Sequence, residues 1–248
     1  MAGERTAGII VIGNEILSGK ITDANASYLC RELRALGVEV RKISVIPDEV
    51  DLIAAEVREF SRTHDVVFTS GGVGATHDDV TMEGVARAIG TRVIRHPQLV
   101  SLLEGYFQGR GAQLTEARLR LAEVPEGAEL ISDGALMFPA VTVRNIYILP
   151  GVPEIFREKF DMLRERFRES PFHLTSVFVS IAESVLADHL NALVARHPEL
   201  MLGSYPEFSN PEYKVKVTLE SKDRGLMERA VEELLAALPP GALVRVQR

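Results

Sequence analysis

The sequence predicts an α/β protein of two units, a larger one over residues 1–170 and a smaller α+β one over residues 171–248. Two observations support this prediction. Between Thr6 and about Glu169, β-branched apolar runs alternate with longer segments of helical period, which indicates a mainly parallel sheet with helices on its faces. At Ser170-Pro171 the helical pattern ends because proline cannot continue a helix, and a different order of elements follows.

In the larger unit, the elements follow from local periodicity and turn residues. Strands are predicted where apolar runs are short and bounded by turns, at residues 7–12, 38–45, 65–70 and 145–149. Helices are predicted where apolar side chains recur every three or four positions, at residues 29–36, 48–60, 81–89, 97–107 and 153–168. Gly37 is expected to end the first of these helices, because glycine adopts positive φ easily. Residues 126–143 are rich in strand formers, and their pairing stays open.

The smaller unit is predicted to contain strand, helix, strand, strand, helix and strand in that order. The segments are residues 174–181, 182–195, 201–208, 213–219, 223–238 and 243–246. That order is the ferredoxin-like plan. RNA binding is not expected, because the strands lack the aromatic pattern of RNA-binding modules and the unit has no basic stripe.

Composition and charge narrow the classes of function. The formal net charge is -7 and the Lys and Arg residues are scattered, so general nucleic-acid binding is not expected. The single cysteine, Cys30, has no partner for an internal disulfide, which favours a reducing compartment. The apolar run that follows the N-terminus is too short for a signal sequence or a membrane span. We therefore expect a cytoplasmic protein with no membrane partner, and a homodimer as the default for a soluble enzyme.

The most informative segment is a glycine-rich turn between the third strand and the next helix. It reads Ser70-Gly71-Gly72-Val73-Gly74-Ala75-Thr76-His77-Asp78-Asp79-Val80-Thr81. The backbone amides of residues 71–74 and the hydroxyls of Ser70 and Thr76 are expected to bind the oxygens of a diphosphate. The alternative is a tight turn in which Asp78, Asp79 or Thr81 caps the next helix. Adjacent carboxylates in an irregular loop point in different directions, so one aspartate is expected to face a ligand or metal and the other the backbone.

Three further segments follow strands and should reach the same edge of the sheet, where open α/β folds bind ligands. They are Gly13-Asn14-Glu15-Ile16-Leu17-Ser18-Gly19, Pro47-Asp48-Glu49 and Pro150-Gly151-Val152-Pro153-Glu154. Glu15 is either a ligand for a ribose or metal or a first-turn helix carboxylate. Asp48 is, from its position alone, an N-cap of the second helix. The Pro150-Pro153 segment reads both as a wall of the ligand site and as a rigid turn with Pro153 as the first helical residue.

Other catalytic templates are absent from the sequence. There is no G-x-S-x-G elbow and no phosphate loop ending in Gly-Lys-Ser/Thr. His77 either contacts a phosphate or is a solvated side chain, and no Cys or second His stands at zinc-ligand spacing from it. Metal-assisted phosphoryl or nucleotidyl chemistry remains, with Asp79 predicted as catalytic and Asp78 with Asp79 as ligands of a divalent ion such as Mg²⁺, Mn²⁺ or Co²⁺.

Three motifs resemble the molybdopterin-binding domain family, which includes molybdopterin adenylyltransferases, CinA proteins and the N-terminal part of eukaryotic FAD synthase. They are the segment from Thr6 to Leu17, the loop with Thr76-His77-Asp78-Asp79-Val80-Thr81, and the segment from Leu149 to Glu154. Residues 138–145, 202–206 and 213–219 are most similar to the FAD synthase branch. The resemblance implies a three-layer α/β/α sandwich that binds a nucleotide or pterin diphosphate, and it matches two aspartates of the adenylyltransferases to Asp48 and Asp79.

The resemblance also implies an activity. The CinA and FAD synthase branches are associated with metal-dependent hydrolysis of FAD or ADP-ribose, so we expect a pyrophosphatase of that kind. Binding or adenylylation of molybdopterin, and non-catalytic nucleotide binding, are the alternatives. No FAD-synthesising domain matches within the chain, so FAD synthesis is not expected. Two positions depart from the family pattern: Asn14 replaces the usual Asp, which removes a possible metal ligand, and Ala75 replaces the usual Pro.

Overall fold

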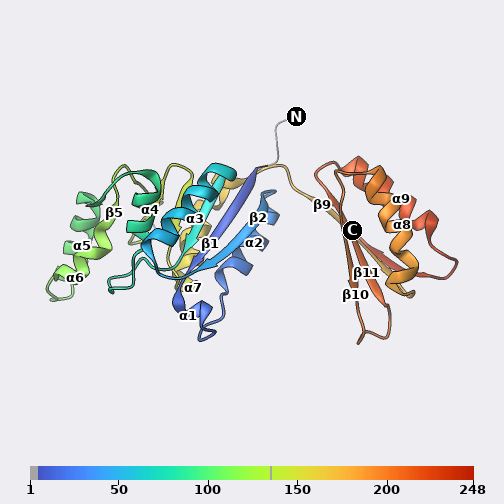
Figure 1. Cartoon of the computed structure of the whole chain (residues 1–248), viewed down its shortest axis with the longest axis horizontal. Helices are drawn as coiled ribbons and strands as arrows, with labels where there is room; N and C mark the ends of the chain where they lie inside the picture. The colour runs from blue at the N-terminus through green and yellow to red at the C-terminus, as the bar shows by residue number, and fades with distance from the viewer. Residues whose placement is uncertain (1–4, 135) are drawn as a thin grey trace. The chain divides into compact units, whose positions relative to one another are not determined.

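The computed structural model describes residues 5–134 and 136–248. It divides the chain into two compact units, Met1–Glu169 and Ser170–Arg248, and the division falls at the Ser170-Pro171 interruption (Figure 1). The first four residues of the predicted larger unit and Ala135, within the segment left open above, lie outside the described residues.

The first unit is built on a six-stranded sheet of order β2-β1-β3-β8-β7-β6. Its strands are β1 (Thr6–Ile12), β2 (Glu39–Ile46), β3 (Val66–Ser70), β6 (Glu129–Ile131), β7 (Ala140–Val143) and β8 (Ile146–Leu149). Strands β2, β1, β3 and β8 run parallel, whereas β7 and β6 pair in antiparallel fashion. The sheet is therefore mixed and mainly parallel, and the segment whose pairing stayed open supplies its two antiparallel strands.

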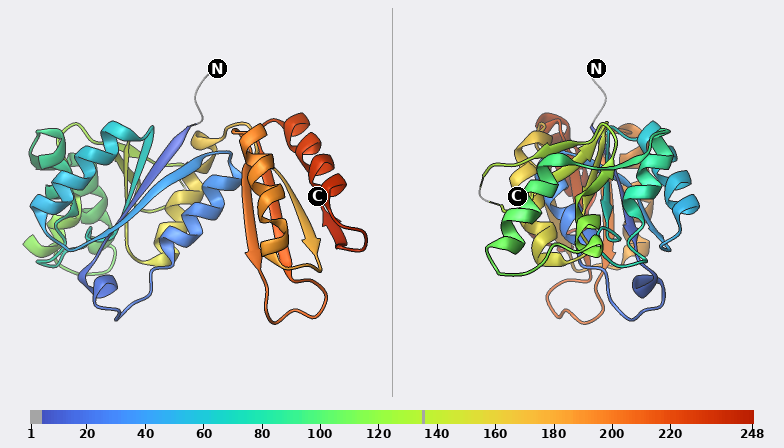
Figure 2. Two further views of the ribbon diagram at one scale, coloured as in Figure 1. Left: turned by 45° about the vertical axis from the view of Figure 1, so that its right-hand side comes forward. Right: turned by 90° about the vertical axis from the view of Figure 1, so that its left-hand side faces the viewer.

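Helices cover both faces of this sheet. Helices α2 (Asn25–Ala35) and α7 (Pro153–Leu163) pack on one face, and α3 (Val50–Thr63) and α4 (Thr81–Ile89) on the other, as the end-on view of Figure 2 shows. Successive residues of β1 point to opposite faces, so Ile9 belongs to the α2 and α7 core and Ile10 to the α3 and α4 core. Because both faces are covered, β1 and β3 are buried at almost every position.

Shorter elements complete the first unit. They are α1 (Asn14–Leu17), β4 (Val93–Arg95), α5 (Pro97–Gln108), α6 (Glu116–Leu119), a 3₁₀ turn (Arg120–Ala122) and β5 (Glu123–Pro125). Strands β4 and β5 form a separate two-stranded sheet. Five of these elements, all except α5, have only three or four residues, which is too few to show a period, and the sequence did not predict them.

The ends of two predicted helices can be compared with the structure. Gly37 has φ 82° and follows the end of α2, which confirms it as the terminating residue. Pro153 is the first residue of α7, which is also confirmed. The predicted helix 153–168 is too long, however, because α7 ends at Leu163 and a 3₁₀ turn (Arg164–Phe167) follows.

The second unit contains β9 (His173–Val179), α8 (Glu183–Arg196), β10 (Met201–Pro206), β11 (Val215–Ser221), α9 (Arg224–Ala237) and β12 (Leu243–Gln247). Its strands form an antiparallel sheet of order β10-β11-β9-β12. In β11, buried and half-buried residues alternate, and Val215, Val217 and Leu219 pack in one core with side chains of α8 and α9.

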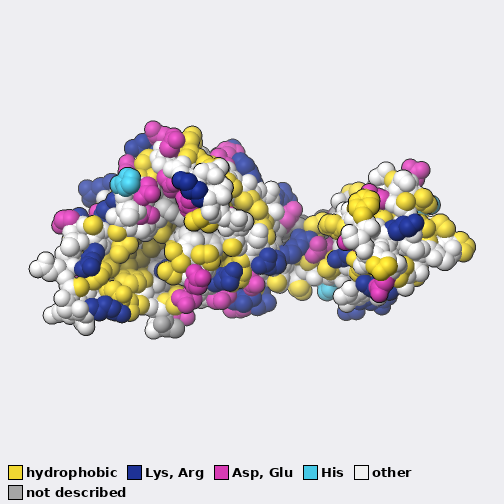
Figure 3. Space-filling view, turned by 90° about the horizontal axis from the view of Figure 1, so that it is seen from below, with side chains coloured by type: hydrophobic (Ala, Val, Ile, Leu, Met, Phe, Trp, Pro, Cys, Tyr) yellow, Lys and Arg dark blue, Asp and Glu magenta, His cyan; other side chains and the backbone are white. Residues whose placement is uncertain are grey.

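The surface carries charges of both signs. On the face of the first unit seen in Figure 3, acidic and basic side chains are interspersed. Within the described part of the chain, no helix has the length and apolar character needed to cross a membrane.

Candidate functional site

The strand order brings the predicted segments to one edge of the first sheet. Strands β1, β2, β3 and β8 are parallel, so their carboxyl ends lie at the same edge. The chain moves from β1 to one side for β2 and to the other side for β3, which makes the crevice between β1 and β3 a topological switch point. Ligands of open α/β sheets bind at such points. The segment that begins at Gly13 and the loop that begins at Ser70 both leave the sheet there.

The backbone of the glycine loop requires its first two glycines. Gly71 has φ 106°, and a Cβ added there would lie 2.1 Å from the carbonyl oxygen of Ile12. Gly72 has φ 63°, and its Cβ would lie 2.4 Å from the Thr81 hydroxyl. Thr81 closes the loop, because its hydroxyl donates to the Gly71 carbonyl (2.9 Å) and its N–H donates to the Gly72 carbonyl (3.0 Å). The alternative of Thr81 as a helix cap is therefore wrong.

The loop also presents unpaired backbone donors. Among the described residues, the N–H groups of residues 72–75 donate to no acceptor, although these residues are half-buried. Buried or half-buried backbone donors are normally paired. Successive N–H groups in a turn of this kind form a concave anion-binding site. The loop, which includes the predicted Val73 and Gly74, can therefore hold an anion through its backbone.

The two adjacent aspartates of the loop have different surroundings. The Oδ2 atom of Asp79 accepts from the N–H of Thr76 (2.8 Å) and from its hydroxyl (2.5 Å). The same carboxylate packs against Gly74, where a Cβ would lie 2.5 Å from Oδ2. Asp78 instead lines a separate cleft with Asp48. One aspartate faces the backbone, as expected, but it is Asp79, the residue predicted as catalytic.

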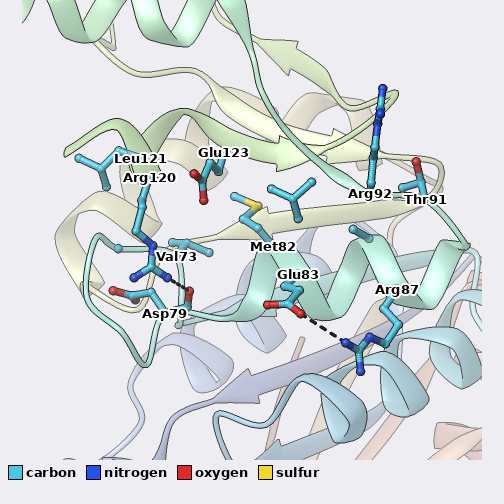
Figure 4. Close-up of a pocket in the computed structure, with 13 residues that line it drawn as sticks. Val73, Asp79, Met82, Glu83, Arg87, Thr91, Arg92, Arg120, Leu121 and Glu123 are labelled. Carbon is cyan, nitrogen blue, oxygen red and sulfur yellow. Dashed lines mark hydrogen bonds and ion pairs between the residues drawn. The ribbon is translucent and has the colours of Figure 1, made fainter. Parts of the chain in front are cut away.

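Arg120 holds the loop from outside. Its guanidinium donates to the carbonyls of Thr76 (2.6 Å), Asp79 (3.2 Å) and Ala75 (3.5 Å), as Figure 4 shows for its approach to Asp79. Arg120 and Asp79 line a cavity of about 400 Å³ behind the loop. No local pattern points to Arg120, because it lies in the 3₁₀ turn between α6 and β5.

We name the cleft in front of the loop the acidic cleft. Its volume is about 600 Å³, and it is lined by Asn14, Glu15, Leu17, Ser18, Lys20, Asp48 and Asp78. Oδ1 of Asp48 lies 3.5 Å from the position that a Cβ of Gly72 would take, so the cleft borders the glycine loop. Three carboxylates and one ammonium group therefore face the same space.

Asp48 does not cap the second helix, which corrects the interpretation from sequence position alone. Helix α3 begins at Val50 with Glu49 before it, and no side chain caps it. Oδ2 of Asp48 instead accepts from the N–H of Asn14 (2.8 Å), across the sheet edge. Burial raises the pKa of Asp48, the Asn14 hydrogen bond opposes this shift, and the charges of Glu15 and Asp78 add to it.

The acidic cleft offers the kind of ligand atom that a divalent ion prefers, but its side chains alone do not complete a coordination shell. Carboxylate oxygens are the ligands that Mg²⁺ prefers. Among residues 5–134 and 136–248, however, no three His, Cys, Asp or Glu side chains lie close enough to hold an ion together. Mg²⁺ in nucleotide sites is usually bound by one or two carboxylates and by substrate phosphates, and that arrangement needs no such cage. Asp78 and Asp79 line different cavities, so the predicted pair is not the set that the geometry favours.

Other predicted residues have partners inside the protein or face solvent. The Ser70 hydroxyl is buried and accepts from Asn25 Nδ2 (2.9 Å). The His77 side chain is 98% exposed, with Nδ1 3.9 Å from Asp78. Gly151 and Pro153 line a second, smaller pocket with Asn25, whereas Pro150 does not line it. Asn25 and Lys20 are among the cleft and pocket residues that the sequence interpretation missed.

Comparisons with known proteins cover nearly the whole chain. A family model described as "Probable molybdopterin binding domain" matches residues 8–169, and one described as "FAD synthase, middle domain" matches residues 171–247. A protein from Archaeoglobus fulgidus is 39% identical, over 92% of this chain and 96% of its own length. A "Probable FAD synthase" from Caenorhabditis elegans is 34% identical over 94% of this chain, which spans only 50% of that protein.

A solved structure shares the fold of the first unit. It is CinA from Thermoplasma acidophilum, a protein of unknown function, with a TM-score of 0.60 and 28% identity. The similarity covers 66% of this chain and 100% of that one. The expected resemblance to this family and to its CinA and FAD synthase branches is confirmed.

Proposed function

This chain belongs to the molybdopterin-binding domain family, and on that basis we propose that it is a divalent-metal-dependent pyrophosphatase that cleaves a nucleotide diphosphate compound. FAD and ADP-ribose are the first candidate substrates, since its relatives include a "Probable FAD synthase". The products would be two monophosphates, for example FMN and AMP from FAD.

One observation carries this proposal: a row of unpaired backbone N–H groups borders a cleft with three carboxylates. The amides of residues 72–75 suit the oxygens of a diphosphate. Asp48, Glu15 and Asp78 would repel that diphosphate unless a cation lay between them, and Lys20 is the one cationic side chain that lines the cleft among the described residues. The combination of amide donors and excess carboxylates therefore favours a site for a metal-bound diphosphate over one for a free anion.

The residues of the acidic cleft can divide the work of hydrolysis. Asp78 and Glu15 would hold the ion together with phosphate oxygens, and the ion would neutralise the diphosphate. Asp48 would accept the proton of the attacking water as its oxygen bonds to phosphorus and the bond from phosphorus to the bridging oxygen breaks. A carboxylate with a raised pKa is a better proton acceptor at neutral pH, and the pKa of Asp48 is raised by burial.

The experiment measures products directly. We would incubate the chain with FAD or ADP-ribose and Mg²⁺, Mn²⁺ or Co²⁺, and separate the products by chromatography. We expect FMN and AMP, or ribose 5-phosphate and AMP, only when metal is present. Absence of products with every metal and both substrates would refute the proposed reaction.

Variants distinguish the two assignments of the catalytic carboxylate. Asp48→Asn and Asp78→Asn should each lower kcat by about 100-fold or more, as loss of a general base or metal ligand does. Asp51→Asn is the matched control, because Asp51 lies on the exposed side of α3 and pairs with Arg87. If Asp79→Asn abolishes turnover without lowering the melting temperature, Asp79 is catalytic, as the family resemblance implies, and our assignment of the reaction to Asp48 and Asp78 fails.

A second candidate is a non-catalytic nucleotide-binding module. Asn14 favours it, because this residue lines the acidic cleft where the family usually supplies a fourth carboxylate. Tight binding of ADP-ribose with no product under any metal would support this candidate. Tight binding of molybdopterin, with or without transfer of AMP from ATP, would instead identify the pterin as the ligand.

A further inference from the structure

Asn25 is a buried polar residue with half of its side-chain amide unpaired. The residue is 3% exposed and stands at the start of α2. Its Nδ2 donates to the Ser70 hydroxyl (2.9 Å) and to the Gly151 carbonyl (2.9 Å). Because a carbonyl can only accept, the Gly151 contact fixes which end of the amide is nitrogen. Oδ1 is then left buried, and it has no partner within the described structure.

Asn25 lines a pocket that differs in character from the acidic cleft. The pocket has a volume of about 230 Å³, and Ile16, Ile21, Val152 and Pro153 contribute apolar walls. Ile21 and Val152 are 56% and 51% exposed, which is unusual for a cluster of large apolar side chains around a buried acceptor. Pockets for complete small ligands are about 300–1,000 Å³, so this one suits a single ring system.

The position of the pocket connects it to the diphosphate site. Ser70 and Gly71, which open the glycine loop, also line the pocket, and Glu15 lines both the pocket and the acidic cleft. A ligand whose diphosphate lies on the loop can therefore place an attached ring in the pocket. The charged residues that line the pocket, Glu15 and Asp23, are both acidic. A pocket whose described lining offers hydrogen-bond acceptors and no cationic side chain favours a neutral group that donates hydrogen bonds. It disfavours a further phosphate.

We propose that this pocket binds the planar nitrogen heterocycle of the diphosphate ligand and that Asn25 Oδ1 accepts a hydrogen bond from an N–H on the edge of the ring. The inference rests on the proposed function in one respect, the placement of the diphosphate on the glycine loop. Asn25 is thus a specificity residue, which favours rings with an N–H group over rings of the same shape without one. A site built to pair with a donor rejects analogues that lack it, because its buried acceptor stays unpaired.

Two ligand pairs test the proposal by calorimetry with Ca²⁺ present, a divalent ion that screens the three carboxylates and lies outside the set proposed for turnover. The first pair is ADP and purine riboside 5′-diphosphate, which lacks the exocyclic amine. The second is FMN and N3-methyl FMN, which lacks the ring N–H. We expect at least one pair to show about a 10-fold or larger preference for the donor-bearing ligand. Equal affinities within both pairs would overturn the proposal and leave an internal water as the partner of Oδ1.

Two variants locate the preference in the pocket. In Asn25→Ala the ratio of affinities should fall to about 1, whereas Asn191→Ala, an exposed asparagine of the second unit, should keep the wild-type ratio. If Asn25→Ala does not fold, Ile21→Ser is the second test, since Ile21 is already exposed. Ile21→Ser should weaken ring-bearing ligands several-fold and leave the affinity for inorganic pyrophosphate unchanged. Equal weakening of pyrophosphate would overturn the placement of the ring.

These outcomes separate the inference from the proposed reaction. A donor preference that depends on Asn25, together with no hydrolysis under any metal, would refute the pyrophosphatase and retain the ring pocket. Hydrolysis without donor preference would do the opposite.

Discussion

The two sides of the glycine loop differ in how completely their polar groups are paired. On the closed side, Asp79 accepts two hydrogen bonds from Thr76, Arg120 donates to three loop carbonyls, and Thr81 ties the two ends of the loop together. On the open side, the amides of residues 72–75 have no acceptor within the described chain. The acidic cleft borders this side.

The pairing of polar groups indicates which part of the loop is available to a ligand. Groups that are already paired hold the backbone in place, whereas unpaired groups are available to a ligand. Asp78 and Asp79 are neighbours in sequence and lie on opposite sides, so closeness to the loop does not by itself indicate a catalytic role. Four variants test this division.

Gly71→Ala should disturb the closed side and the open side of the loop together, and so lower both stability and anion binding. The added methyl would lie 2.1 Å from the Ile12 carbonyl, and φ 106° is strained for any residue with a Cβ. We expect a loss of more than about 2 kcal/mol in the free energy of unfolding, together with loss of pyrophosphate binding. Thermal denaturation and calorimetry measure the two effects.

Gly90→Ala is the matched control for this prediction. Gly90 has φ 75°, but a Cβ there meets no atom within 4 Å. It should cost only the conformational strain of about 1 kcal/mol and leave binding unchanged. If both variants behave alike, the contact with Ile12 is not what requires glycine at position 71.

Asp79→Asn should disturb the closed side. An amide oxygen can still accept both bonds from Thr76, but the charge that strengthens them is lost. We expect a destabilisation of about 1–2 kcal/mol and a fall in melting temperature of about 2–6 °C. Asp78→Asn, on the exposed open side, should change stability by less than about 0.5 kcal/mol. A larger loss of stability in Asp78→Asn than in Asp79→Asn would contradict the placement of Asp79 on the closed side.

The sequence predicted the fold more completely than the site. Alternating runs identified the parallel strands and main helices, because burial on both faces leaves long apolar stretches that are easy to recognise. The site depends on contacts between distant residues. Asp48 has the local pattern of a helix cap, yet its partner is the N–H of Asn14, 34 positions earlier. Local patterns cannot show such a contact, nor which of two adjacent aspartates turns inward.

Arg120→Met should loosen the closed side without adding or removing a group on the open side. The variant keeps an unbranched apolar stem but loses the donors to the carbonyls of Thr76, Asp79 and Ala75. We expect about 1 kcal/mol of destabilisation and a several-fold weaker affinity for pyrophosphate, because the amides of the loop are held less firmly. Arg92→Met is the control, since Arg92 lines the same cavity but pairs with Glu126. Equal affinities in the two variants would exclude a positioning role for Arg120.

Asp48→Asn should change stability least of the four variants, and it should raise stability where the other three lower it. Burial raises the pKa of Asp48 in the folded protein, so the folded state binds the proton more tightly than the unfolded state does. The resulting stabilisation is present below the unfolded pKa of about 3.9 and is lost as the pH rises through the higher folded value. Above that value the wild type carries a desolvated charge beside Glu15 and Asp78, which the amide of the variant does not.

The variant should therefore be more stable than the wild type at pH 7, by less than about 1 kcal/mol, because the site is only partly buried. The amide oxygen of Asn can still accept from the N–H of Asn14, so this hydrogen bond does not offset the gain. The difference in free energy of unfolding should decrease steadily as urea unfolding is repeated from pH 7 towards pH 4. At pH 7 the turnover of the variant should be lower than that of the wild type. Higher stability with lower activity is the behaviour of a residue kept for function at a cost in stability. A variant less stable than the wild type at pH 7 would place Asp48 among the groups that hold the loop in shape.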